Sequence, residues 1–163
     1  MVRTNIAALQ EMRGSLSVIA VAACLFTTCT SGERQRLQLE ELERMNRADS
    51  VMLNDSLARD LADWFDRHGT RNEQLRAYYM LGRTYADRGE VPQALEAYHD
   101  AIDRADTTAL DCNYYTLCRV YAQMSDILYY QNLFKDNLRC LKLSVRYALK
   151  ANDSITAVNS YAH

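Results

Sequence analysis

Proline occurs once in the 163 residues of this chain, as Pro92, and glycine occurs five times. Both residues mark the tight turns on which β-rich folds depend, so their scarcity excludes a fold of many short strands. Leu, Ala, Arg and Glu, which favour helices, are plentiful instead. The length suits one compact domain. We therefore predict a single all-α domain.

The balance of charge argues against nucleic acid as a partner. The formal net charge is −2 at pH 7, with basic and acidic residues interleaved. A protein that collects phosphate backbones or anionic lipid headgroups needs a sustained positive field. The first 28 residues carry Arg3, Glu11 and Arg13, a net +1, so their removal changes −2 to −3. The conclusion is the same for the remainder.

Residues 1–28 have the layout of an export signal. Arg3 and Arg13 precede an uncharged run that extends from Ser15 to Cys29. This run of roughly 14 residues before Cys29 is shorter than the ~20 residues that a helix needs to cross a bilayer. A permanent transmembrane span is therefore the weaker interpretation. A start at Met12 makes a more compact signal.

The end of this run resembles the signal of bacterial lipoproteins, in which a cysteine after small residues becomes the acylated first residue of the mature chain. Phe26-Thr27-Thr28 precedes Cys29, and Val21-Ala22-Ala23 precedes Cys24. The resemblance implies a lipid such as palmitate on Cys29. Cys24 is the second choice because it leaves a very short apolar region in front of it. The alternative is a plain signal peptide, cut nearby, without lipid.

Three cysteines follow the signal: Cys112, Cys118 and Cys140. An odd number excludes a fully paired disulfide framework. Their spacing also lacks the close Cys pairs of a structural zinc site. We expect all three to pack as small apolar residues, with a Cys118–Cys140 bridge as the alternative.

Residues 29–48 are polar and carry only a thin apolar stripe, which predicts a tether that becomes helical as it reaches the body. Residues 50–163 have apolar side chains at helical spacing and form the predicted domain. Gly69, Gly89 and Pro92 are typical of helix ends and starts. We expect helices at Asp55–His68, Asn72–Arg88, from Pro92 to a turn at Asp106, at Thr108–Tyr130 and Leu133–Lys150, and a last one from Ser154.

Seven residues of the second and third helices share a distinctive spacing. They are Tyr78, Leu81, Gly82, Tyr85, Ala94, Tyr98 and Ala101. This pattern resembles the tetratricopeptide repeat, which has an aromatic residue, Leu-Gly and Tyr in one helix and Ala, an aromatic residue and Ala in the next. Gly82 and Ala94 are small where the helices cross, so the backbones can approach closely. The resemblance implies antiparallel helix hairpins stacked as a short α-solenoid.

A second copy of the pattern lies 43 residues later, whereas the standard repeat is about 34 residues long. Ser125 replaces the small glycine, and Asn137 replaces the small alanine. The longer spacing predicts extended helices. The copy comprises Tyr121, Met124, Ser125, Leu128, Asn137, Leu141 and Ser144. The resemblance extends over roughly Asp55 to Ser160 and is closest to a group of Gram-negative lipoproteins with such repeats.

In that repeat family, the first helices of successive hairpins line a groove that takes an extended peptide or a partner helix. The resemblance therefore implies a partner-binding groove, and Arg and Tyr often dominate interface energies. Its residues would be Arg76, Tyr79, Arg83, Asp87, Arg119, Asp126, Tyr129 and Tyr130. Of these, Tyr79, Tyr129 and Tyr130 are the tyrosines expected to be exposed. The alternative is a solvated charged face with incidental carboxylate pairs.

Little in the sequence points to catalysis. His68 sits at a helix end and His163 is the last residue, while His99 has only Asp103 one turn away as a second metal ligand. Phosphate-binding glycine loops, G-x-S-x-G elbows and H-E-x-x-H motifs are absent. We expect no enzymatic activity, no metal and no cofactor.

These features favour a non-enzymatic protein-interaction module that an N-terminal lipid anchors in the cell envelope, facing the periplasm or the cell surface. The alternative is the N-terminal sensor part of a longer signalling or regulatory protein, because a third repeat opens at Ser154 and then stops. An uncapped repeat end tends to associate, which predicts a homodimer through the C-terminal end.

Overall fold

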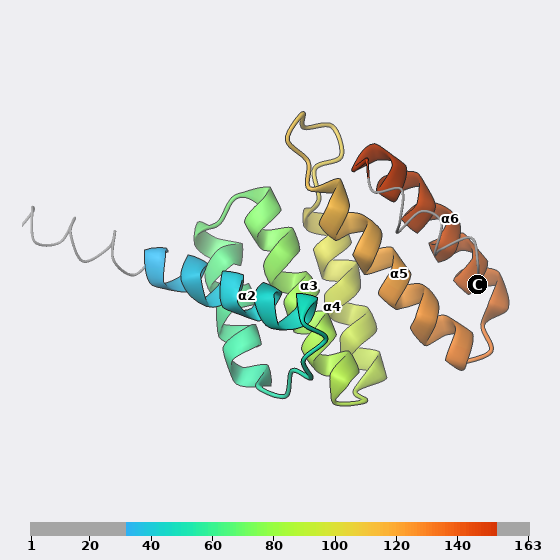
Figure 1. Cartoon of the computed structure of the whole chain (residues 1–163), viewed down its shortest axis with the longest axis horizontal. Helices are drawn as coiled ribbons and strands as arrows, with labels where there is room; N and C mark the ends of the chain where they lie inside the picture. The colour runs from blue at the N-terminus through green and yellow to red at the C-terminus, as the bar shows by residue number, and fades with distance from the viewer. Residues whose placement is uncertain (1–31, 153–163) are drawn as a thin grey trace, which may run out of the picture. The chain divides into compact units, whose positions relative to one another are not determined.

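The computed structural model describes residues 32–152, which form six helices (Figure 1). Residues 32–47 make the first, and the part from residue 39 onward is called the leading helix below. The chain divides into two compact units after Gln38, and the hairpins belong to the second. The other helices are α2 (Asp55–His68), α3 (Arg71–Asp87), α4 (Val91–Arg104), α5 (Tyr114–Tyr130) and α6 (Phe134–Lys150).

Helices that follow one another in the chain pack as antiparallel pairs. The most extensive contacts join α3 to α4 and α5 to α6, while α2 packs on α3 and α4 on α5. The predicted all-α stack of helix hairpins is therefore confirmed.

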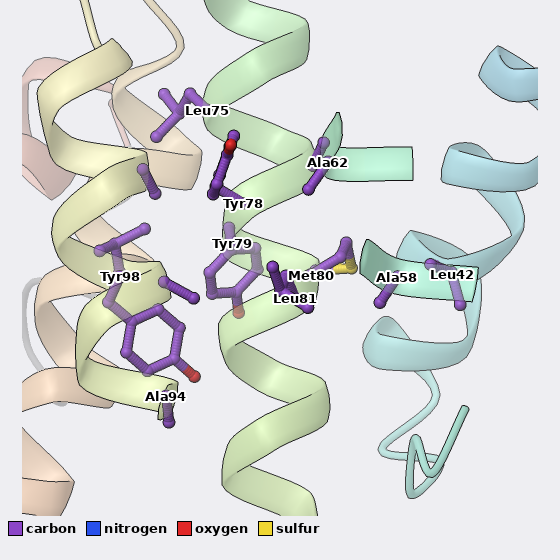
Figure 2. Packing of buried hydrophobic residues seen from close by; sticks show 14 of the residues in the cluster. Leu42, Ala58, Ala62, Leu75, Tyr78, Tyr79, Met80, Leu81, Ala94 and Tyr98 are labelled. Carbon is purple, nitrogen blue, oxygen red and sulfur yellow. The ribbon is translucent and has the colours of Figure 1, made fainter. Parts of the chain in front are cut away.

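Helices α3 and α4 approach most closely at Gly82. A Cβ atom built on Gly82 lies 2.4 Å from the ring carbons Cδ1 and Cε1 of Tyr98, a distance that no side chain tolerates. Tyr98 and Ala94 are fully buried. In Figure 2, Tyr79 and Tyr98 lie between α3 and α4, whereas Met80 points from the other side of α3 toward Ala58 of α2. The small residue therefore sets the spacing of the hairpin.

Local signals account for the ends of these helices. Thr70 and Glu73 form a reciprocal capping box at the start of α3, which satisfies two of the backbone N–H groups that the first turn leaves unpaired. Gly89 follows α3 with φ +76°, where the backbone N–H of Glu90 donates to the carbonyl of Tyr85 at 2.9 Å. This left-handed position favours glycine and ends the helix.

The prediction of a long helix at Thr108–Tyr130 is wrong at the N-terminal end of the helix. Residues 105–113 form turns, and α5 begins only at Tyr114. The Asp106 carboxylate accepts hydrogen bonds from the backbone N–H and the hydroxyl of Thr108, at 3.0 and 2.6 Å, and closes a turn. Asn113 then caps α5 by accepting from the N–H of Thr116 at 3.0 Å.

The connection before α5 accounts for part of the 43-residue spacing between the two copies. Helices α3 and α5 are both 17 residues long and start 43 residues apart. The connection between α4 and α5, residues 105–113, is longer than the roughly two to eight residues usual between packed helices. The expectation of extended helices stays a prediction.

The second hairpin is closed by hydrogen bonds at its crossing. Asn137 donates from Nδ2 to the carbonyl oxygen and to the hydroxyl of Ser125, at 2.9 and 2.8 Å. Ser125 is buried. The two residues that replace Gly82 and Ala94 therefore form a polar contact where the first hairpin has close steric packing.

Cys112, Cys118 and Cys140, the cysteines within residues 32–152, are free thiols. Cys118 and Cys140 are buried, as expected for small apolar residues, and Cys112 is half-buried. Burial raises the pKa of the Cys140 thiol above its ordinary value. The alternative of a Cys118–Cys140 bridge is not realised in the described structure.

The leading helix is part of the core. Leu39 and Leu42 are buried in the same cluster as Ala58, Leu61 and Met80. Leu42, Ala58 and Met80 of this cluster are labelled in Figure 2. The polar segment expected as a tether is helical at residues 32–47, and Leu39 and Leu42 of its apolar stripe are core residues of the second unit.

Among residues 32–152, no helix combines the length and apolarity needed to cross a bilayer. The signal segment with Cys24 and Cys29, and the last helix expected from Ser154, lie outside the described residues.

Candidate functional site

The eight expected groove residues do not lie together in one groove. Three line one cavity, three line a second cavity, and two form an ion pair. Arg76, Tyr79 and Arg119 line a cavity of about 450 Å³. Asp126, Tyr129 and Tyr130 line a second cavity of about 360 Å³. Arg83 and Asp87 form an ion pair within α3.

The larger cavity, called the Arg119 cavity below, is formed by three helices and one loop. The leading helix contributes three residues, and α3 and α5 supply most of the others. The turn before α5 adds Asp111 and Asn113, held by Asn72, which donates to the Asp111 carbonyl at 2.8 Å and accepts from the Asn113 N–H at 3.0 Å. The full lining is Glu43, Asn46, Arg47, Asn72, Arg76, Tyr79, Met80, Asp111, Asn113, Tyr115, Thr116 and Arg119.

Arg76 is neutralised on one wall of the cavity. Its Nε and Nη2 donate to the two carboxylate oxygens of Glu43 at 2.6 and 2.7 Å. Both side chains are more than two-thirds buried. The hydrogen bonds to Glu43 raise the pKa of Arg76. A planar two-point pair of this kind fixes both groups, so Arg76 has little charge left for a ligand.

Tyr79 is buried, with only 4% of its surface exposed, so the expectation that it is exposed is wrong. Its ring packs near Tyr98, with 6.2 Å between ring centroids. Its hydroxyl accepts from Asn46 at 3.4 Å and from Nε of Arg119 at 3.2 Å. Tyr79 therefore positions Arg119 and offers no free face of its own.

Arg119 is half-buried and held by tyrosines. Besides Tyr79, its Nη1 donates to the Tyr115 hydroxyl at 3.5 Å, and the guanidinium carbon lies 5.8 Å from the Tyr115 ring centroid. Burial acts to lower the pKa of Arg119, but its interactions with Tyr79 and Tyr115 outweigh it, so the pKa is raised. Among the described residues, no carboxylate forms an ion pair with Arg119. The cavity therefore contains a fixed cation with an uncompensated charge.

The side chains of Arg83 and Asp87 link α3 to two other segments of the fold. Arg83 donates to Asp87 at 2.9 Å and to Gln123 of α5 at 2.5 Å. Asp87 also accepts from the backbone N–H of Met52 at 2.9 Å. These contacts tie α3 to α5 and to the segment before α2, which indicates a structural role.

The second cavity lies where α5 ends. Tyr129 and Tyr130 are 54% and 80% exposed, as expected. Their rings meet edge to face, and Tyr129 also contacts Phe134, with centroids 6.1 Å apart. This exposed aromatic group is apolar and is separate from the fixed cation.

A third hollow of about 410 Å³ lies among α4, α5 and α6 and has a largely apolar lining that includes Leu95, Ile102 and Met124. His99 and Cys140 also line it. Within residues 32–152, no group of three or more His, Cys, Asp or Glu side chains is arranged to hold a metal ion.

Sequence reasoning missed the contribution of the leading helix. Glu43 and Asn46 lie 33 residues before Arg76 and Tyr79, the residues that they bind. This offset, which is close to one repeat, is the regularity that links these residues in the sequence. The turn residues Asn72, Asp111 and Asn113 have no comparable signal.

Comparison of the chain with protein-family models, with curated proteins and with solved structures finds no match.

Proposed function

We propose that this chain is a non-enzymatic protein-interaction module of the tetratricopeptide-repeat type, and that its Arg119 cavity binds an acidic segment of a partner protein. The spacing from Tyr78 to Ala101 and its copy 43 residues later support the repeat assignment. The close approach at Gly82 supports it further, because that is where the repeat needs its small residue.

The observation that carries the proposal is the charge on Arg119. Among residues 32–152, this half-buried guanidinium donates its hydrogen bonds to two tyrosine hydroxyls, so it has lost part of its hydration without gaining an anion there. A carboxylate entering the cavity would supply that anion through charge-assisted hydrogen bonds. Tyr115, 44% exposed, stands at the same wall and can pack against an incoming chain.

The size of the cavity limits the ligand. About 450 Å³ is near the lower end of the volumes of small-molecule sites, so it accepts a few residues of a peptide. Side-chain amides of Asn46 and Asn72 on the walls can hydrogen-bond a peptide backbone. The partner segment should therefore be short, extended and acidic.

Selection from a random peptide library on the full chain tests this. We expect the selected peptides to be enriched in Asp, Glu or a free C-terminal carboxylate. Arg119→Gln should weaken their binding by about ten- to a hundredfold, the usual value of a hydrogen bond to a charged group. The control is Arg71→Gln, which removes an exposed cation that does not line the cavity. Peptides that bind both variants equally well would overturn the proposal.

We also propose that the module is anchored in the cell envelope by a lipid on Cys29, with Cys24 as the second choice. The support is the sequence of residues 1–28 alone. Mass spectrometry of the protein from its native membrane, compared for wild type, Cys29→Ala and Cys24→Ala, tests it. An acylated N-terminal Cys29 is expected; an intact Met1 or Met12 on a soluble product would contradict it.

A further inference from the structure

Helix α6 gathers basic side chains on one face. All three lysines of the chain, Lys135, Lys142 and Lys150, lie on α6 together with Arg139 and Arg146, and the helix has one acidic residue, Asp136. With 3.6 residues per turn, the five basic positions fall within about a quarter of the helix circumference. All five side chains are exposed. The helix therefore presents a cationic stripe, defined by these five residues.

The cations of this stripe differ from those arginines elsewhere in the structure that hold a carboxylate. Six arginines outside α6 hold carboxylates in ion pairs: Arg44, Arg59, Arg76, Arg83, Arg88 and Arg104. No cation of the stripe forms an ion pair within the described part of the chain. The Lys150 ammonium lies 4.6 Å from the Tyr114 ring centroid, which leaves its charge uncancelled.

Large apolar side chains border the stripe. Phe134, Leu138 and Leu149 are 58%, 51% and 60% exposed and lie along one edge of the same exposed face. Exposed apolar side chains beside Lys and Arg are typical of helices that lie in the interface of a membrane. The phosphate backbone of a nucleic acid offers no comparable environment for leucine.

We propose that the exposed face of α6 docks on the surface of an anionic lipid bilayer. From residue 135 to residue 150 the stripe extends over about 22 Å at 1.5 Å per residue, which matches many distributed charges better than one small anion. The cations would meet the lipid phosphates while Phe134, Leu138 and Leu149 enter the headgroup region. No residue of α6 lines the Arg119 cavity, so this surface is independent of the proposed peptide site.

Vesicle co-sedimentation of the full chain tests the electrostatic part. Binding is compared on phosphatidylcholine vesicles and on vesicles of equal parts phosphatidylcholine and phosphatidylglycerol. The test variant combines Lys135→Gln, Lys142→Gln and Arg146→Gln. The control combines Arg34→Gln, Arg67→Gln and Arg71→Gln, which removes the same charge from exposed positions outside α6.

The N-terminal segment is the same in all three proteins. Each cation near an anionic surface contributes about a fivefold change in affinity, so we expect the test variant to bind anionic vesicles about a hundredfold more weakly. The control should lose far less. Equal losses in the two variants would show that only net charge matters and would overturn the proposal.

Two further measurements distinguish a membrane from a soluble polyanion and do not depend on the charge variants. Leu138→Ser with Leu149→Ser should weaken binding to anionic vesicles severalfold and leave binding to inorganic polyphosphate unchanged. In the wild type, anionic vesicles should protect the three lysines from an amine-reactive reagent, as measured by peptide mass spectrometry. Vesicle binding that is insensitive to the leucines, or lysines that react equally fast with and without anionic vesicles, would contradict membrane docking.

Discussion

At Gly82 the backbones of α3 and α4 come close enough that the position cannot hold a methyl group. Inside a helix, Gly→Ala normally stabilises by about 0.5–1 kcal/mol because alanine loses less backbone freedom on folding. Here the new Cβ would lie 2.4 Å from the buried Tyr98 ring. The clash of the new methyl group with the Tyr98 ring therefore costs more free energy than the better helix propensity of alanine gains.

We predict that Gly82→Ala lowers the free energy of unfolding by about 1–3 kcal/mol, the usual cost of overpacking a core. Urea denaturation measures it. In a Tyr98→Leu background the same substitution should cost less, because the ring is gone. A stabilised Gly82→Ala protein would contradict the packing described for this crossing.

The hydroxyl of Tyr98 is buried and has no hydrogen-bond partner among the described residues. Burial raises the pKa of Tyr98 well above its ordinary value. Removing an unpaired buried polar group relieves a desolvation cost of about 1–3 kcal/mol at most. We predict that Tyr98→Phe is at least as stable as the wild type in thermal denaturation, whereas Tyr98→Ala is destabilised by about 3–5 kcal/mol. A clear loss of stability in Tyr98→Phe would show that the hydroxyl has a partner.

Ionisation of Tyr121 makes the stability of the fold depend on pH in the alkaline range. Burial, and then the neighbouring Tyr147 and Cys140, raise the pKa of Tyr121 from its ordinary value of 10.0 to about 12. Between these two values the unfolded chain loses the proton and the folded chain keeps it, so stability falls as the pH rises.

Because Tyr121 is partly solvated, we expect it to account for about 1 kcal/mol of that loss. The free energy of unfolding should therefore decline less steeply between pH 10 and pH 12 in Tyr121→Phe than in the wild type. Parallel declines in the two proteins would exclude this contribution.

At the level of single residues, the sequence predicted those positions that the repeat pattern constrains. Gly82, Ala94 and Tyr98 lie where expected, because their sizes are dictated by one helix crossing. Tyr79 was expected to be exposed and is buried. Its burial depends on the leading helix and on Arg119, which come from distant parts of the chain.

Helix boundaries were predictable wherever a strong local signal marked them. The helix expected at Asn72–Arg88 differs from α3 by one residue at each end. The helix expected at Leu133–Lys150 differs from α6 by one residue at its start. The start of α5 was placed six residues early. Asp106 and Asn113 are both suitable caps, and only their hydrogen bonds to Thr108 and Thr116 show which one begins a helix.

The cap at Asn113 should carry measurable stability. Its side chain accepts the N–H of Thr116, and its backbone N–H donates to Asn72. We predict that Asn113→Ala lowers the free energy of unfolding by about 1 kcal/mol, a typical cost of losing an N-cap. Asn113→Asp retains the acceptor and should stay near the wild type in the same urea titration. Equal effects of the two substitutions would argue against capping.

For the molecule as a whole, net charge and composition did not predict two features of the structure. The net charge of −2 is correct, but it hides five cations on α6 that are not interleaved with acidic residues. The polar segment before residue 48 has few apolar residues, yet Leu39 and Leu42 are buried in the core, and Glu43 binds Arg76. Charge and burial are set by position on a helix face, which composition does not record.

Three helices that are distant in the sequence build the Arg119 cavity. Glu43 of the leading helix lies 33 residues before Arg76 of α3, and Arg119 of α5 lies 43 residues after Arg76. The repeat pattern predicted that Arg76 and Arg119 face one groove. It could not predict that one of them is neutralised and the other is not, because Glu43 lies outside the recognised copies. The uncompensated charge on Arg119 is therefore a property of the assembled fold.

The most direct test of this account is the side-chain Nε–H resonance of Arg119 in an NMR titration of the full chain with a peptide selected as described above. We predict that this resonance shifts and saturates with the same dissociation constant as peptide binding, and that the effect disappears when the carboxylates of the peptide are amidated. A peptide that binds while the Arg119 resonance stays unchanged would contradict the assignment of this cavity as the binding site.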